Sequence, residues 1–231
     1  MSAGLEPVLV RPALYQETDA IVPPHPPFSL LILAGGAGLR LGGDKLWRDL
    51  GGNPLIRHGL GRLIPYASEV IFSAPDDDRL HRLADSLPIP ARIAADQYSG
   101  GGPLAGLHAG LAAANFHSVF ALAADMPFAN PLLALDLLRR LDACDAAVPL
   151  TTGPSGTEPE PLHAAYRRIC SKAAAAALQA GRRRAVSFLP AVRTEFVPPE
   201  SWFVLDPTSL SFFNVNTPQD WKRACSLIGQ P

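Results

Sequence analysis

An aliphatic run that ends in a glycine-rich, cationic loop constrains this chain more than any other stretch. Residues 30–33 are Leu-Leu-Ile-Leu, and residues 34–45 are Ala-Gly-Gly-Ala-Gly-Leu-Arg-Leu-Gly-Gly-Asp-Lys. The first part has the composition of a buried strand. Glycines let backbone N–H groups close around an anion without a Cβ in the way, and Arg40 and Lys45 would supply positive charge. The stretch therefore predicts a phosphate-binding loop, with a glycine-rich surface turn as the alternative.

The loop departs from the two common nucleotide-binding motifs at defined positions. The dinucleotide motif G-x-G-x-x-G requires a third glycine where Leu41 stands. The P-loop requires lysine directly after glycine, but Asp44 separates Gly43 from Lys45, and Leu46 follows in place of Ser or Thr. These mismatches argue against a Rossmann oxidoreductase and against a P-loop protein.

Polar side chains also follow other expected strands. Asp125 comes directly after the apolar run 119–124, and Asp96 comes after residues 91–95. In an open parallel sheet, ligands collect at the carboxyl ends of the strands. A carboxylate at Asp125 suits Mg²⁺, which prefers one or two carboxylates plus phosphate oxygens. The alternative for Asp125 is a helix cap, but Asn130 is better placed to cap the helix that starts at Pro131.

Three further positions have two interpretations each. Asp96 could accept hydrogen bonds from a purine edge or a ribose hydroxyl, or could be a turn aspartate. Alternation along an expected strand over residues 212–216 would put Asn214 and Asn216 on one face, toward an acceptor or a metal shell, although turn formation before Pro218 also explains Asn216. His163 could touch the acceptor or be a half-buried strand histidine.

The pattern L-A-G-G-x-x-x-R-x-G-x-D-K over residues 33–45, followed by Gly-Asn-Pro-Leu at 52–55, resembles the signature of nucleotidyltransferases with the nucleotide-sugar pyrophosphorylase fold. Within that superfamily, the chain is most similar to the molybdenum cofactor guanylyltransferases. Residues 102–106 match their G-P-L-A-G segment, where cytidylyltransferases usually differ, and residues 214–218 match their closing N-x-N-T-P. The resemblance covers about residues 29–228, without the N-terminal arm and with a long loop at 151–161.

The resemblance implies a Mg²⁺-dependent transfer of GMP from GTP to the terminal phosphate of molybdopterin-bound molybdenum cofactor, with release of pyrophosphate. Its catalytic residues would be Lys45, Arg40 and Asp125, with Asp125 as the metal ligand, and Asn214, Asn216 and His163 would contact the acceptor. Its nucleotide site would comprise Leu33, Ala34, Gly35, Gly36, Gly38, Lys45, Asn53, Asp96, Gly102, Pro103 and Leu104. Molybdoenzyme-delivery proteins would be further partners. The alternatives are a cytidylyltransferase, a sugar- or polyol-phosphate nucleotidyltransferase, and a non-catalytic nucleotide-binding module.

The remaining sequence predicts an α/β fold: a single three-layer, Rossmann-like domain whose mostly parallel sheet has helices on both faces. We expect strands near residues 29–34, 70–74, 91–95, 119–124, 146–150, 162–166, 194–197 and 212–216, with helices near 55–66, 107–114, 131–141, 170–180 and 219–228. Residues 1–27, with prolines at positions 23, 24, 26 and 27, would be a flexible arm, and 28–231 the nucleotidyltransferase domain.

Composition excludes several other classes of protein. The net charge of −1 gives no general attraction to nucleic acid or to an anionic membrane. Three scattered cysteines match no metal-ligand spacing and suit a reducing compartment. No apolar run approaches the roughly 20 residues that cross a bilayer, and no secretion signal is evident. We therefore expect a cytoplasmic protein.

Overall fold

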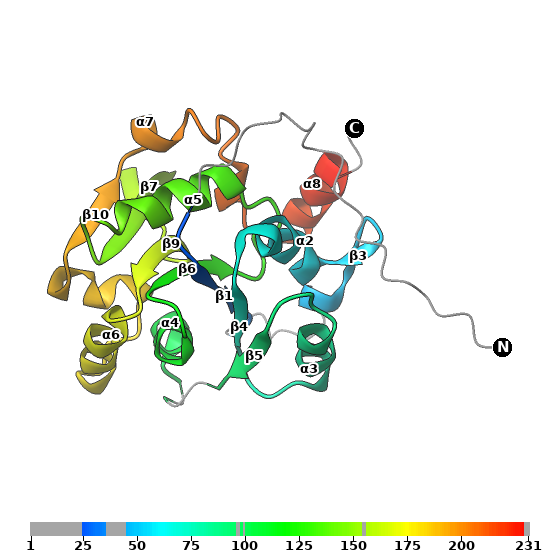
Figure 1. Ribbon diagram of the computed structural model, residues 1–231. Helices are drawn as coiled ribbons and strands as arrows, with labels where there is room; N and C mark the ends of the chain where they lie inside the picture. Colours follow the sequence, from blue (N-terminus) through cyan, green and yellow to red (C-terminus); the bar gives the residue numbers. More distant parts are fainter. Residues whose placement is uncertain (1–24, 36–44, 96–97, 99, 154–155, 229–231) are drawn as a thin grey trace.

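Strand β1 (Phe28–Leu33) lies at the centre of an eight-stranded sheet in the computed structural model, which describes residues 25–35, 45–95, 98, 100–153 and 156–228 (Figure 1). All of its side chains are buried, because both faces of the sheet are covered. It pairs in parallel with β4 (Glu69–Ser73) on one side and with β6 (Ser118–Ala123) on the other. The aliphatic run that precedes the glycine-rich loop is therefore the middle of the core.

The sheet order is β10-β7-β9-β6-β1-β4-β5, with β8 paired to β7. The outer strands are β5 (Ala91–Ala94), β7 (Ala146–Gly153), β8 (Gly156–Pro159), β9 (His163–Arg167) and β10 (Thr194–Val197). Along the main path only β9 runs antiparallel to its neighbours, β6 and β7. The carboxyl ends of β1, β4, β5 and β6 therefore meet at one edge of the sheet, the edge at which ligands collect.

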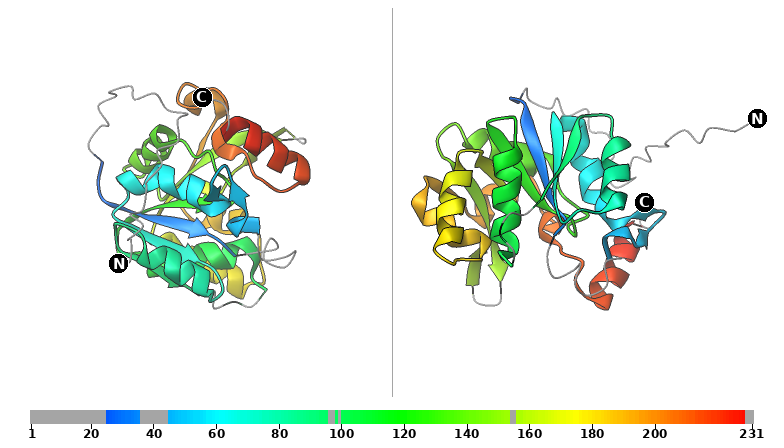
Figure 2. Two further views of the ribbon diagram at one scale, coloured as in Figure 1. Left: turned by 90° about the vertical axis from the view of Figure 1, so that its right-hand side faces the viewer. Right: turned by 90° about the horizontal axis from the view of Figure 1, so that it is seen from below.

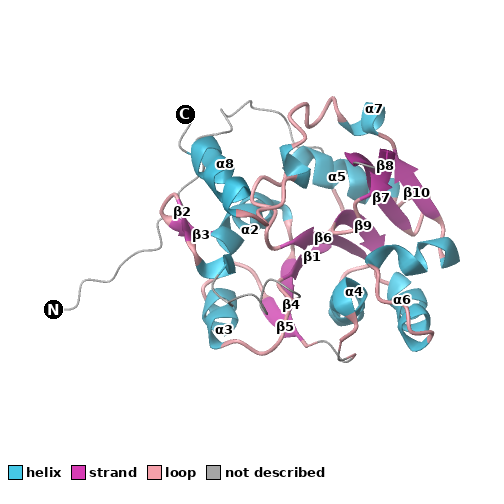
Figure 3. Cartoon of the chain, turned by 180° about the vertical axis from the view of Figure 1, so that it is seen from behind, coloured by secondary structure: helices cyan, strands magenta, loops and turns pink. Residues whose placement is uncertain are grey.

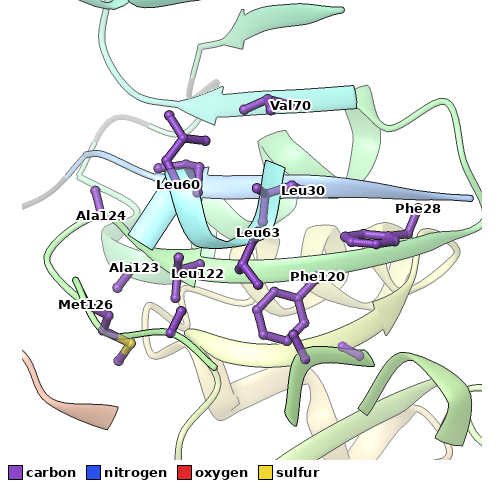
Figure 4. Packing of buried hydrophobic residues seen from close by; sticks show 14 of the residues in the cluster. Phe28, Leu30, Leu60, Leu63, Val70, Phe120, Leu122, Ala123, Ala124 and Met126 are labelled. Carbon is purple, nitrogen blue, oxygen red and sulfur yellow. The ribbon is translucent and has the colours of Figure 1, made fainter. Parts of the chain in front are cut away.

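Helices cover both faces of this sheet. Helices α2 (Leu55–Leu63) and α5 (Pro131–Arg140) lie on one face, and α4 (Gly102–Ala113) and α6 (Cys170–Gln179) lie side by side on the other (Figures 1 and 2). Leu60 and Leu63 of α2 point toward Leu30 and Leu122 of the sheet (Figure 4). The alternate residues of β1 point to the opposite face of the sheet, where Leu31 packs against α4. The contact is so close that a Cβ on Gly110 of α4 would lie 2.1 Å from Leu31 Cδ1. The continuous apolar pattern of β1 follows from this two-sided packing.

Shorter elements complete the fold. Helix α3 (Asp78–Asp85) packs through Leu80 and Leu83 into the same core cluster as α2. A hairpin of β2 (Asp49–Leu50) and β3 (Asn53–Pro54) lies beside α8 (Pro218–Ile228), as Figure 3 shows from behind. The others are the helix α7 (Pro199–Trp202) and the 3₁₀ turns η1 (Lys45–Trp47), η2 (Ile64–Tyr66), η3 (Ala185–Ala191) and η4 (Leu210–Phe212).

The expected fold class is confirmed, and two local predictions are wrong. Residues 151–161 are not a loop alone: β7 continues to Gly153 and turns back through Gly156 into β8, with Thr151 opposite Glu158. Threonine favours extended backbone, and Gly156, at φ 111°, supplies the conformation that the turn needs.

The expected strand at 212–216 is the second error. Residues after η4 cross the end of β6 instead of pairing along a strand, and Val215 N donates to Asp125 O at 3.0 Å. Both edges of β6 are already occupied by β1 and β9, so no edge there is free to accept another strand.

Within the described residues, no helix combines the length and the apolar composition required to cross a membrane. The predicted arm lies outside these residues up to position 24, so its flexibility stays a prediction.

Candidate active site

Three side chains from distant parts of the chain meet at the carboxyl edge of the sheet. Lys45 Nζ donates to Asp125 Oδ2 at 2.8 Å and to Asn216 Oδ1 at 2.9 Å. Lys45 begins η1, Asp125 follows β6 by two residues, and Asn216 precedes α8 by two. The side chains of Lys45 and Asp125 keep 25% and 23% of their surface exposed, so the ion pair is reachable from solvent. The structure thus brings together three residues that the sequence singled out separately.

Backbone hydrogen bonds fix the turn that carries Asp125. Ala124 N donates to Leu33 O at 3.1 Å, which ties the end of β6 to the end of β1. Gly59 of α2 packs directly against Met126, the residue after Asp125, since a Cβ on Gly59 would lie 2.4 Å from Met126 O. Asn130 caps α5 by accepting from Leu132 N at 2.9 Å, as predicted. Asp125 is therefore not needed as a helix cap, and its carboxylate is directed to the edge of the sheet.

The two glycine-rich segments approach each other through Ser73, at the end of β4. A Cβ at Gly35 would lie 3.6 Å from Ser73 O, and a Cβ at Gly106 of α4 would lie 3.0 Å from Ser73 Oγ. The ends of β1 and β4 and the first turns of α4 therefore pack against one another around Ser73. Six residues predicted for the nucleotide lie on these segments. Gly35, Gly102 and Pro103 are exposed, whereas Leu33, Ala34 and Leu104 are buried beneath them. Sequence reasoning missed Ser73, although it is the polar residue at the end of an expected strand.

The other predicted nucleotide residues are not part of these segments. Asn53 lies in the β2–β3 hairpin, opposite Leu50, and the hydrogen bonds of the described residues do not connect it to Lys45 or Asp125. Four predicted positions lie outside the described residues: Gly36, Gly38, Arg40 and Asp96.

Glu160 adds a second carboxyl group near Asp125. Strands β6 and β9 pair with Leu122 opposite His163, and Ala123 N donates to Leu162 O at 2.8 Å, which carries the chain back toward Asp125. Burial, and secondarily the negative charge of Asp125, raise the pKa of the Glu160 carboxyl above its ordinary value. Leu162 N donates to Glu160 Oε1 at 3.0 Å and orients the group. Sequence reasoning selected His163 from this segment and missed Glu160.

The structure contradicts the predicted contact between His163 and an acceptor. His163 has no exposed surface, and its ring lies edge-on to Phe120 and Phe212, with centroids 5.1 Å away in both cases. Neither ring nitrogen has a hydrogen-bond partner among the described residues. The reason is that β9 lies between β6 and β7, where η4 covers this face. His163 is a core histidine.

Asn214 also differs from its prediction. Because residues 212–216 do not form a strand, alternation does not place Asn214 beside Asn216. Its side-chain Nδ2 lies 3.5 Å from Phe212 O, within its own turn, whereas Asn216 reaches Lys45. Asn214 therefore has a local contact, and Asn216 has the contact that belongs to the site.

Burial of His163 predicts a specific loss of stability in acid. Burial lowers the pKa of its imidazole to about 3, against an ordinary 6.5, and the nearby Asp206 offsets this only in part. Below pH 6.5 the unfolded chain binds a proton that the folded chain does not, so the free energy of unfolding falls as pH falls from 6.5 toward 3.

We expect His163→Leu to remove this dependence. Between pH 7.5 and pH 5 the wild-type protein should lose about 2 kcal/mol more than the variant, at roughly 1.4 kcal/mol for each pH unit below 6.5. Urea unfolding at both pH values measures the difference. Parallel losses in the two proteins would show that His163 is already protonated in the folded state or accessible to water.

The residues present fit a divalent cation that is shared with a substrate. The described residues contain no group of three or more His, Cys, Asp or Glu that could hold a metal ion. Mg²⁺ does not require such a group, since it is usually held by one or two carboxylates together with substrate phosphates and water. Asp125 supplies one such carboxylate at the carboxyl edge of the sheet.

A lysine and a carboxylate lie together at the carboxyl edge of a mostly parallel sheet, where a glycine-rich segment begins, and this is the arrangement expected of a nucleotide-binding α/β protein. The family follows from the sequence as a whole. The chain belongs to the MobA-like NTP transferase domain family, whose model matches residues 30–193.

Curated relatives and solved structures agree with this assignment. The chain is 35% identical over 194 residues to a probable molybdenum cofactor guanylyltransferase of Pelotomaculum thermopropionicum, covering 84% of this chain and 90% of that protein. It is 39% identical over 171 residues to a molybdenum cofactor guanylyltransferase of Burkholderia ambifaria, covering 70% and 80%. The names of both relatives agree with the family that the sequence motifs indicated.

The crystal structure of molybdopterin-guanine dinucleotide biosynthesis protein A from Archaeoglobus fulgidus superposes with a TM-score of 0.71 at 30% identity, covering 86% of this chain and 97% of that one. A 4-diphosphocytidyl-2C-methyl-D-erythritolsynthase from Anaerococcus prevotii gives 0.69 at 15% identity, covering 88% and 99%. The second likeness shows the fold alone.

Proposed function

We propose that this protein is a Mg²⁺-dependent guanylyltransferase that transfers GMP from GTP to the terminal phosphate of molybdopterin carrying molybdenum, and releases pyrophosphate. The observation that carries the proposal is the Lys45 ammonium held on Asp125 and Asn216 at the carboxyl edge of the sheet, in a chain of this family. The names of the relatives, molybdenum cofactor guanylyltransferases, support both the nucleotide and the acceptor.

The reaction requires charge neutralisation more than proton transfer. An oxygen of the acceptor phosphate, already ionised at neutral pH, forms a bond to the α-phosphorus of GTP. The bond from that phosphorus to the bridging oxygen of the β-phosphate breaks, and pyrophosphate leaves with the electron pair. No general base is needed, so catalysis depends on position and on compensation of negative charge.

Lys45 and Asp125 would share that task. The Lys45 ammonium has three N–H donors, and within the described part of the chain Asp125 and Asn216 accept two of them, which would leave the third for a phosphate oxygen. Asp125 would hold Mg²⁺, which would offset charge on the phosphate oxygens. Arg40 would add a forked donor for the β and γ oxygens. Asp125 would thus hold two cations, the Lys45 ammonium and Mg²⁺, next to the reacting phosphates.

Pyrophosphate release from each of the four nucleoside triphosphates, with molybdenum-loaded molybdopterin as acceptor, tests this function. GTP with Mg²⁺ should react fastest, and a chelator should stop the reaction. A preference for CTP would favour a cytidylyltransferase. Pyrophosphate release only with a sugar or polyol phosphate would identify that phosphate as the acceptor. Nucleotide binding without pyrophosphate release would favour a non-catalytic module.

We also propose a cytoplasmic location. All three cysteines are free thiols, and Cys144 and Cys170 are buried in the core, which suits a reducing compartment.

A further inference from the structure

Helix α8 begins with a reciprocal pair of hydrogen bonds. Asp220 N donates to Thr217 Oγ1 at 3.1 Å, and Thr217 N donates to Asp220 Oδ2 at 2.7 Å. This is a capping box, in which the residue before the helix and the third helical residue satisfy each other's amides, with Asp in place of the usual Glu. Pro218 occupies the first helical position, where its missing N–H costs nothing. The start of α8 is therefore fixed by local chemistry.

One contact of Asp220 goes beyond what the helix requires. Asn216 N donates to the same carboxylate oxygen, Oδ2, at 3.0 Å. Asn216 lies outside the helix, so this bond does not cap it. It instead fixes the peptide of the residue whose side-chain Oδ1 accepts from Lys45 Nζ.

The same short segment is anchored on its other side. Val215 N donates to Asp125 O at 3.0 Å, and the Val215 side chain is buried with Leu50 and Phe128. Asn216 thus stands between one residue tied to the Asp125 backbone and one tied to Asp220. The backbone from which the Asn216 side chain extends is therefore held in place on both sides, although the residue itself is exposed.

We propose that Asp220 is a positioning residue for the Lys45 ammonium and acts through Asn216. Its carboxylate fixes the Asn216 backbone, and the Asn216 side chain then holds Lys45 Nζ beside Asp125. Hydrogen bonds from Thr217 and Asn216 lower the pKa of the Asp220 carboxyl, and the positive charge of Lys45 acts in the same direction. The expected effect of Asp220 on turnover rests on the proposed function, whereas its effect on the position of the Lys45 ammonium does not.

Chemical labelling of Lys45 tests the proposal without any turnover. The chain has three lysines, and the exposed Lys172 on α6 is an internal reference for limiting acetic anhydride, read by mass spectrometry. Asp220→Ala should raise the ratio of Lys45 to Lys172 labelling about threefold or more, because Lys45 loses a held acceptor. Asp220→Glu, which restores the usual capping box, should keep the wild-type ratio. An unchanged ratio in Asp220→Ala would overturn the proposal.

Lys222→Gly is the matched control for helix stability. Lys222 is exposed on α8, and glycine there should lower Tm by an amount similar to the loss of the cap. It should leave the labelling of Lys45 unchanged. If Lys222→Gly raised Lys45 labelling as much as Asp220→Ala does, Asp220 would have a structural role only.

Kinetics then separate positioning from the proposed reaction. Asp220→Ala should lower kcat/KM for pyrophosphate release about tenfold, Asp220→Glu should restore it, and Lys222→Gly should not change it. In an Asn216→Ala background, Asp220→Ala should have no further effect, because both act on Lys45 through the same amide. Additive losses would contradict the proposal. If the wild-type protein used none of the four triphosphates, the proposed function would fail, and labelling would still decide the role of Asp220.

Discussion

Replacing Lys45 with methionine should lower kcat/KM for nucleotidyl transfer about a thousandfold, near the upper range for loss of a fixed donor to developing charge. Methionine keeps most of the length of the side chain and removes only the charge and the donors. The triphosphate would then enter a site in which Asp125 has lost its only side-chain partner among the described residues. Steady-state pyrophosphate release with GTP, Mg²⁺ and the molybdopterin acceptor measures the effect.

Lys222→Met is the control for this prediction, since Lys222 is an exposed lysine of α8 and has no part in the proposed site. It should keep wild-type activity. Both variants should have a Tm close to that of the wild type, because the Lys45–Asp125 pair is partly exposed and contributes roughly 1 kcal/mol or less to stability. Near-normal turnover in Lys45→Met would remove Lys45 from the catalytic account.

Asp125→Asn should be as damaging, for a different reason. Asparagine has the same shape and can still accept from Lys45, but it removes the negative charge that would hold Mg²⁺. We expect kcat/KM to fall about a thousandfold. Binding of Mn²⁺ in the presence of GTP, followed by electron paramagnetic resonance, should weaken in parallel, and raising the concentration of Mg²⁺ should not restore full activity.

Asp85→Asn controls for the loss of one negative charge. Asp85 is exposed at the end of α3 and is not part of the proposed site. It should bind Mn²⁺ and turn over like the wild type. Wild-type Mn²⁺ binding in Asp125→Asn would place the metal elsewhere and would leave Asp125 as a partner of Lys45 only.

The site was predictable where it depends on strand ends. Buried strands are continuous apolar runs in this sequence, so the pattern of apolar residues alone places Asp125 just after β6. The motif also placed Lys45 next to the glycine-rich loop. The two residues are 80 positions apart in the sequence, and their direct contact in the structure agrees with both predictions.

The errors arise where tertiary packing decides. His163 is buried because β9 is inserted between β6 and β7 and is then covered by η4, and short-range alternation reports neither event. Glu160 comes near Asp125 only through the register of β9 on β6. Asp220 was detectable, since Thr217-Pro-Gln-Asp220 has the spacing of a capping box, but its bond to Asn216 N depends on the approach of the chain to α8.

The central claim is that Lys45 and Asp125 jointly hold a triphosphate and its metal. A crystal structure with Mn²⁺ and a GTP analogue that has a non-hydrolysable α–β linkage tests it most directly. We predict an anomalous Mn²⁺ peak within coordination distance of Asp125 and of the triphosphate, with Lys45 Nζ bonded to a phosphate oxygen. Nucleotide and Mn²⁺ bound away from an intact Lys45–Asp125 pair would contradict the account.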